Sequence, residues 1–188
     1  MGKQDEILKD HLSEQIALEE HLFKTIEDQI SDIEGDDFSD ARDLLKSTSK
    51  TLEKHFTPLN QLLDTLEKDA LLVRMGSIAK NGDARAHTLN SEKQKRQISK
   101  ILRDIYSALN LITMSNTLLH TTALALEYDE VAKMALEHLE NLAPLVVKIG
   151  ELIPEIVARE LYAESSGINL AIAKTALLNT QRAWRIVD

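Results

Sequence analysis

The sequence contains no cysteine, which excludes a disulfide framework, a thiolate metal site and redox chemistry at a thiol. Aromatic residues make up only 4% of the chain, so a core has to be built from aliphatic side chains, which suits helices packed on helices. Glycine (6) and proline (3) are scarce among the 188 residues, and this argues against the many tight turns of a β fold. No apolar run approaches the ~18 residues of a membrane span.

Positive charge is also in deficit, and the formal net charge of −9 indicates an acidic surface. Such a surface repels phosphate backbones, so a nucleic-acid partner is not expected. The N-terminal stretch "MGKQDEILKD" is polar and unlike a secretory signal, and we therefore expect a cytoplasmic protein. One basic cluster interrupts the acidic pattern, and we interpret it as the solvated face of a helix start: Lys93, Lys95, Arg96, Lys100 and Arg103.

Apolar residues recur at helical spacing and predict five helices within a single domain spanning residues 1–188. Pro58 predicts a kink in the second helix or its division into two shorter ones, because proline lacks the backbone donor. Pro144, Gly150 and Pro154 are expected to bend or interrupt the fourth helix. Residues 76–91 show no periodicity and form the longest predicted connection. The predicted helices cover residues 3–33, 38–75, 92–126, 128–163 and 167–186.

The short connections after the first and third helices predict two antiparallel hairpins. The expected fold is therefore all-α, an antiparallel four-helix bundle with an additional C-terminal helix. Two topologies remain open, an up-down-up-down bundle and one in which the connection at residues 76–91 crosses the length of the bundle. About 16 residues can just span that length if they are fully extended.

Several polar residues fall on the apolar faces of these helices. Glu19 lies near the middle of the apolar arc of the first helix, between Ile16 and Leu22. A carboxylate in that position must be paired, protonated or bound to a cation, because burying a bare charge is costly. The other inward or marginal polar residues are Gln15, His55, Asn116, His120 and His138.

This pattern of helices resembles the ferritin-like proteins, in particular the small bacterial stress-associated bundles of that superfamily. The resemblance covers most of residues 3–163. Ferritin-like proteins use one Glu from each of two helices and a Glu-x-x-His pair from each of the other two. The resemblance implies Glu19 as the carboxylate of the first helix, with His55 and His138 as the histidines of the second and fourth helices.

The family's other carboxylates have no counterpart in this sequence. Leu52 and Ala135 stand where the Glu of each Glu-x-x-His pair is expected, and the third helix offers apolar residues instead of a carboxylate. A dinuclear iron oxidase site therefore cannot be assembled.

Three classes of function remain open. The pattern favours a non-catalytic ferritin-like bundle, a stress-associated structural or interaction protein that has lost its di-metal site and needs no cofactor. One alternative is a mononuclear protein that holds a single Fe, Mn or Zn ion with Glu19, His55 and His138. The other is a bundle that binds a small apolar ligand in a cavity beside Met114, Met134 and the prolines.

Three further expectations concern geometry and partners. His120 and His138 are not expected to share a metal, because they lie a helical turn apart in level. Glu19 is expected to approach His138 in an up-down-up-down bundle and to lie further from it in a crossover bundle. The C-terminal helix is apolar on more than one side, which predicts a second neighbour, most simply a two-fold homodimer.

Overall fold

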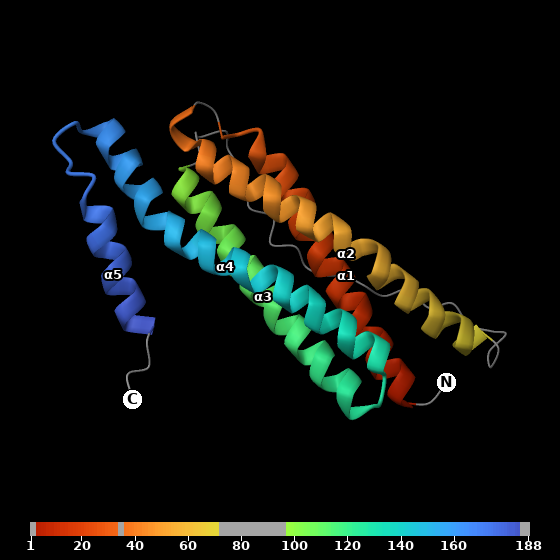
Figure 1. Cartoon of the computed structure of the whole chain (residues 1–188). Coiled ribbons are helices and arrows are strands. Elements are labelled where there is room, and N and C mark those ends of the chain that lie inside the picture. The colour runs from red at the N-terminus through yellow and green to blue at the C-terminus, as the bar shows by residue number, and fades with distance from the viewer. Residues whose placement is uncertain (1–2, 34–35, 72–96, 185–188) are drawn as a thin grey trace.

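A computed structural model describes residues 3–33, 36–71 and 97–184, which form α-helices, one short 3-10 helix and turns, with no β-strand among them (Figure 1). The prediction of an all-α chain is therefore confirmed over these residues. The connection at residues 76–91 and the basic residues Lys93, Lys95 and Arg96 lie outside them. The elements are α1 (Lys3–Ile30), η1 (Asp36–Phe38), α2 (Ser39–Leu71), α3 (Ile98–Ala125), α4 (Asp129–Glu164) and α5 (Ile172–Trp184).

The prolines do not divide the helices that contain them. Pro58 lies inside the continuous α2, and Pro144 and Pro154 lie inside the continuous α4. The alternatives of a divided second helix and an interrupted fourth helix are therefore wrong, while a kink or bend at these residues stays a prediction. Proline at position 58 removes the donor to the carbonyl of Lys54. Lys54 itself is exposed, and a carbonyl on the solvent side of a helix can accept from water in place of the missing donor.

The four long helices pack side by side, and α1 and α4 each contact both α2 and α3. The colour gradient in Figure 1 shows that α1 and α4 run in one direction and that α2 and α3 run in the other. The end of α2 and the beginning of α3 therefore lie at opposite ends of the helical bundle. This order of directions differs from the up-down-up-down topology that the sequence left open.

Two clusters of buried aliphatic side chains fill the interior, one toward each end of the bundle. On each helix, buried polar residues lie in the sequence between the members of the two clusters. Each fully buried Leu or Ile contributes about 1.5–3 kcal/mol, so the apolar clusters supply the stability that holds a polar layer between them. The first cluster includes Leu22, Ile26, Leu45, Leu102 and Ile149, the second includes Leu8, Leu12, Leu59, Leu119 and Val131, and the polar layer contains Gln15, Glu19, His55, Asn116 and His138.

The turn between α3 and α4 fixes how these two helices face each other. Glu127 adopts a left-handed backbone conformation with φ of 63°, and the amide of Tyr128 donates to the carbonyl oxygen of Ala123 at 2.9 Å. The hydroxyl of Tyr128 also donates to the Asp5 carboxylate, which ties the turn to the beginning of α1. The sequence predicted one helix ending at residue 126 and the next beginning at residue 128, and the structure confirms a short connection there.

The last helix, α5, packs along one side of α4 (Figure 1). Gln181 Nε2 donates to Glu151 Oε1 at 3.3 Å across this contact. Several apolar side chains of this segment remain exposed, among them Leu170, Ile172 and Leu178. The segment therefore leaves apolar surface exposed beside α4.

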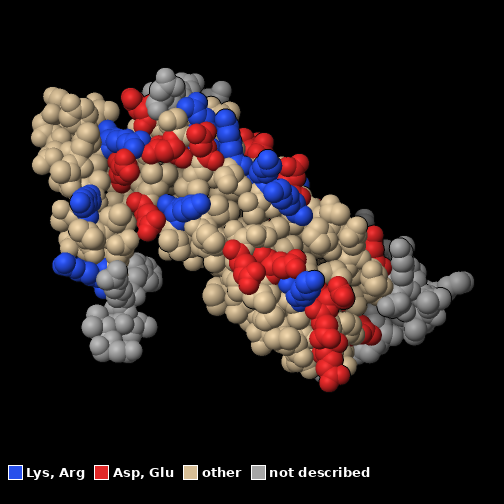
Figure 2. All heavy atoms as spheres, viewed as in Figure 1, with Lys and Arg blue, Asp and Glu red and all other residues tan. Residues whose placement is uncertain are grey.

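Charged side chains of both signs cover the face shown in Figure 2, and acidic ones dominate at the end where α3 turns into α4. Two residues of the predicted basic cluster, Lys100 and Arg103, are described, and both are exposed. Arg103 donates to the neighbouring carboxylate of Asp104 at 2.7 Å. Within the described part of the chain, no helix combines the length and the apolar composition needed to cross a membrane.

Candidate metal centre

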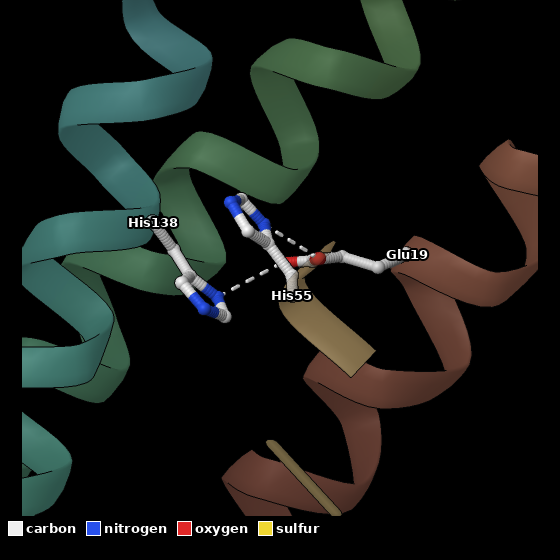
Figure 3. A group of neighbouring side chains, drawn as sticks. All are labelled: Glu19, His55 and His138. Atoms are coloured by element: carbon white, nitrogen blue, oxygen red, sulfur yellow. Dashed lines mark hydrogen bonds and ion pairs between the residues drawn. The ribbon is translucent and has the colours of Figure 1, made fainter. Parts of the chain in front are cut away.

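Three buried residues from three helices meet in the polar layer (Figure 3). Glu19 comes from α1, His55 from α2 and His138 from α4, and their potential ligand atoms all lie within 4.8 Å of one another. Glu19 is 0% exposed and each histidine is 3% exposed. The three residues that the sequence singled out therefore lie together in the interior.

Both imidazole rings direct Nδ1 at the same carboxylate (Figure 3). Nδ1–H of His55 donates to Oε2 of Glu19 at 3.0 Å, and Nδ1 of His138 lies 3.7 Å from Oε1 of Glu19, beyond hydrogen-bond range. The two rings stack in parallel, with centroids 3.6 Å apart and planes 8° apart. The stacked arrangement places the Nδ1 atoms of both rings near one carboxylate group.

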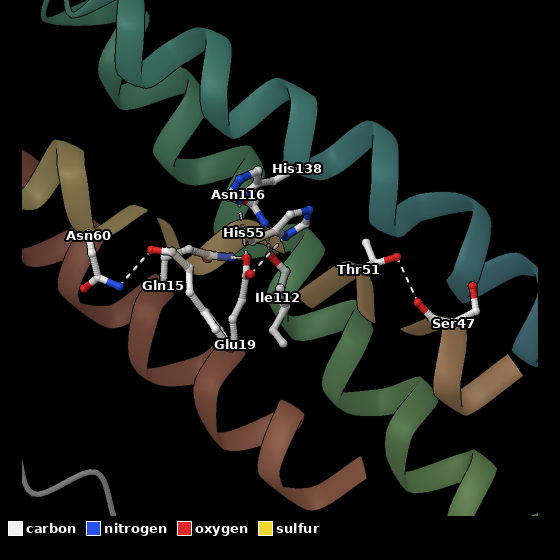
Figure 4. A network of polar contacts seen from close by, with 10 residues as sticks. Gln15, Glu19, Ser47, Thr51, His55, Asn60, Ile112, Asn116 and His138 are labelled. Atoms are coloured by element: carbon white, nitrogen blue, oxygen red, sulfur yellow. Dashed lines mark hydrogen bonds and ion pairs between the residues drawn. The ribbon is translucent and has the colours of Figure 1, made fainter. Parts of the chain in front are cut away.

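Two amide side chains complete the polar layer (Figure 4). Gln15 Nε2 donates to Oε1 of Glu19 at 2.6 Å, one helical turn away on α1. Asn116 Nδ2 on α3 donates to the backbone carbonyl of Ile112 at 3.2 Å. The sequence predicted inward positions for Gln15 and Asn116 but no role for them. The feature that could have pointed to a role is an amide side chain on an otherwise apolar helix face.

Several buried atoms in this layer have no hydrogen-bond partner among the described residues. They are Oε1 of Gln15, Nε2 of His55, Oδ1 of Asn116 and Nδ1 of His138. Buried polar groups are nearly always paired, because an unpaired one loses its hydration without compensation. The concentration of such atoms around one carboxylate indicates that this layer is built to hold a further polar group.

The charge states in the cluster suit cation binding. Burial by itself would raise the pKa of Glu19, but polar contacts with His138 and His55 and their charges outweigh burial and lower that pKa to about 2. Burial lowers the pKa of His138; contact with Glu19 opposes this change, and the charge of His55 adds to it. An ionised carboxylate and a neutral imidazole are the forms that bind metal ions.

His120 lies outside this cluster. Nδ1–H of His120 donates to the backbone carbonyl of Ala132 at 2.8 Å, so this half-buried ring links α3 to α4. The group formed by Glu19, His55 and His138 does not include it.

We expected Glu19 to lie further from His138 in a crossover bundle, in which α2 and α3 run in the same direction. This expectation is wrong. These residues approach to 3.7 Å although α1 and α4 run in the same direction. Glu19 lies near the middle of α1, so its level in the bundle depends little on the direction in which α1 runs.

Comparison with known proteins supports the fold and assigns no activity. No family model matches the chain, and no curated protein matches its sequence. The chain is similar to a crystal structure of a protein from Xanthomonas campestris pv. campestris str. ATCC 33913, with a TM-score of 0.68 and 18% sequence identity. The match covers 87% of this chain and 99% of that one. At this identity the likeness shows an all-helical fold alone.

Proposed function

We propose that this protein is a ferritin-like antiparallel four-helix bundle that binds one divalent transition-metal ion through Glu19, His55 and His138. The observation that carries the proposal is the convergence of two Nδ1 atoms on one buried carboxylate, at 3.0 and 3.7 Å. Both distances are shorter than two metal–ligand bonds of ~2.1 Å laid end to end, ~4.2 Å. A single ion can therefore contact all three residues once Nδ1 of His55 gives up its proton, either to solvent or to Nε2 of the same ring.

A second ion is not supported by the residues around this cluster. Leu52 and Ala135 occupy the positions of the missing family carboxylates, and both are fully buried in the apolar clusters. Neither side chain offers a ligand atom. The donor set favours a mononuclear site, and Fe, Mn and Zn all accept nitrogen and oxygen ligands of this kind.

The alternative of an interaction protein with a vestigial site is less well supported by the geometry. A bound cation would pair lone pairs in this layer that have no partner among the described residues. Because Glu19 is 0% exposed, a substrate has no direct access to the carboxylate. The proposal is therefore a non-catalytic bundle in which the ion serves structure or sequestration.

The apolar-ligand alternative receives little support. Met134 is packed in the second apolar cluster, whereas Met114 is 60% exposed, so the two methionines do not line a common cavity. A cavity of about 310 Å³ lies between α4 and α5, but its lining includes the charged residues Glu151, Glu155, Arg159 and Lys174. Pockets for small apolar ligands are lined mostly by hydrophobic side chains.

Metal analysis tests the proposed function. Protein purified without a metal-affinity tag is expected to contain about one equivalent of a first-row transition metal, and chelation should lower its melting temperature because the ion binds only the folded state. Adding back Mn²⁺, Fe²⁺ or Zn²⁺ should restore that temperature. Substoichiometric metal after purification, together with an unchanged melting temperature in the presence of each ion, would contradict the proposal.

We also propose that the protein forms a homodimer through its C-terminal segment. Leu170, Ile172 and Leu178 remain exposed beside α4, and such apolar surface usually contacts a further neighbour. Light scattering at high micromolar concentration is expected to give about twice the 21.1 kDa chain mass. Leu178→Glu should shift the protein toward the monomer, whereas Thr180→Glu at an exposed position should not. A monomer for the unmodified chain would contradict this expectation.

A further inference from the structure

The third helix is the only one of the four long helices that contributes no residue to the group formed by Glu19, His55 and His138. Its buried residue at the corresponding level is Asn116, which is 0% exposed. Asn116 and His138 lie equally far in sequence from Glu127, the residue with positive φ at the turn between the antiparallel α3 and α4. Both side chains are buried, and Figure 4 shows them together in the polar layer.

The orientation of the Asn116 amide follows from its hydrogen bond. The backbone carbonyl of Ile112 can only accept, so the NH₂ group of Asn116 faces it, at 3.2 Å. The amide oxygen Oδ1 then points away from Ile112 and has no partner among the described residues. The helix thus holds a carbonyl oxygen unpaired in the interior, in the same layer as the unpaired Nδ1 of His138.

Gln15 is arranged differently. Its amide nitrogen donates to Oε1 of Glu19 at 2.6 Å, so Gln15 contacts the carboxylate and orients it. Residues that hold a metal ligand in place in this way are a recurrent part of metal sites. The amide oxygen of Gln15 is also unpaired, but the nitrogen of the same amide faces Glu19. Gln15 therefore acts as a positioning residue, whereas the amide nitrogen of Asn116 contacts its own helix and leaves Oδ1 available.

We infer that Oδ1 of Asn116 is the fourth protein ligand of the ion, so that all four long helices contribute to one site that favours Mn²⁺ or Fe²⁺. This inference rests on the proposed function. Two imidazole nitrogens, a carboxylate and an amide carbonyl form a mixed nitrogen and oxygen set. Carbonyl and carboxylate oxygens suit Mn²⁺, whereas Zn²⁺ with four protein ligands is most often held by thiolates and imidazoles.

Titration of the metal-free full-length protein with Mn²⁺ and with Zn²⁺ tests the inference. Asn116→Leu is expected to weaken Mn²⁺ binding at least ~10-fold. Removing a residue that only hydrogen-bonds to a metal ligand already has an effect of this size, so the loss of a ligand itself should have at least as large an effect. Its effect on Zn²⁺ binding should be clearly smaller. Paramagnetic resonance of Mn²⁺ supplies a second readout, because the bound-ion spectrum should change on loss of a ligand.

Asn110→Leu is the matched control. Asn110 also lies on α3 and also donates its amide N–H to a carbonyl one turn earlier, that of Tyr106 at 2.8 Å, but it is only half-buried and lies outside the polar layer. Mn²⁺ binding should survive this substitution unchanged. If Asn116→Leu does not fold, Asn116→Asp decides, since a carboxylate there should bind Mn²⁺ at least as tightly as the amide does.

The outcomes separate this inference from the proposed function. Mn²⁺ binding by Asn116→Leu equal to that of the unmodified chain would overturn the ligand role of Asn116 and leave the three-residue site intact. A tenfold or greater loss in Asn116→Asp would also overturn the inference. Failure of the unmodified chain to bind either ion would overturn both the proposed function and the inference.

Discussion

The His138→Ala variant is expected to lose its metal, falling from about one equivalent to a small fraction of one. The substitution removes one of two nitrogen donors that face Glu19, and no other described His, Asp, Glu or Cys joins this group to replace it. Metal binding of this kind depends on every ligand, because the remaining donors no longer offset the loss of the ion's hydration. Elemental analysis of both proteins, purified in parallel without a metal-affinity tag, measures the effect.

The His120→Ala variant is the control for this experiment. His120 already donates its Nδ1–H to the carbonyl of Ala132, and it lies outside the group around Glu19. Its substitution should therefore leave the metal content unchanged. Metal that survived His138→Ala would exclude His138 as a ligand, and metal that disappeared from His120→Ala as well would contradict the separation of the two histidines.

The metal-free protein is expected to lose stability steeply in acid, between pH 4.5 and about 2. The pKa of Glu19 falls from its ordinary value of 4.5 to about 2 in the folded state, because contacts with the two histidines outweigh burial. The unfolded chain therefore binds the proton more readily than the folded chain does, and protonation favours unfolding. The stabilisation is complete above pH 4.5 and lost through this interval, and it amounts to on the order of 3 kcal/mol.

Comparison with Glu19→Gln isolates this contribution from those of the other carboxylates. Glutamine has no proton to gain. Between pH 4.5 and 2, the free energy of unfolding should therefore fall less for the variant than for the unmodified protein, and the two decreases should differ by on the order of 3 kcal/mol. Denaturant titrations of both chelated proteins at several pH values provide the measurement. Parallel pH profiles for the two proteins would show that Glu19 is not held ionised by its histidine neighbours.

The apolar burial of the core lies outside the polar layer. The aliphatic clusters on either side of the layer supply apolar burial without help from Glu19, His55 or His138. A buried ion pair often contributes little net stability compared with apolar side chains of similar volume. The cost of keeping these polar residues in the interior is therefore consistent with a binding role.

Helical periodicity predicted most of the secondary structure correctly. The short connection between the third and fourth helices was located correctly, because two strongly periodic stretches meet there. Propensity alone could not decide between a kink and a division at Pro58, because it does not show whether the carbonyl left without a donor can be paired with water. The unpaired atoms of Gln15 and Asn116 could not be predicted, since pairing depends on neighbours from other helices.

The amino-acid sequence alone determined which face of each helix carries Glu19, His55 and His138, because a period of 3.6 residues fixes the angular position of every side chain on its own helix. Only the tertiary structure decided that these faces meet around one carboxylate. The directions of α2 and α3, and the level at which each helix crosses its neighbours, arise from contacts between residues far apart in the chain. Periodicity carries no information about such contacts, so the convergence of two imidazoles on Glu19 appears only when the helices are packed.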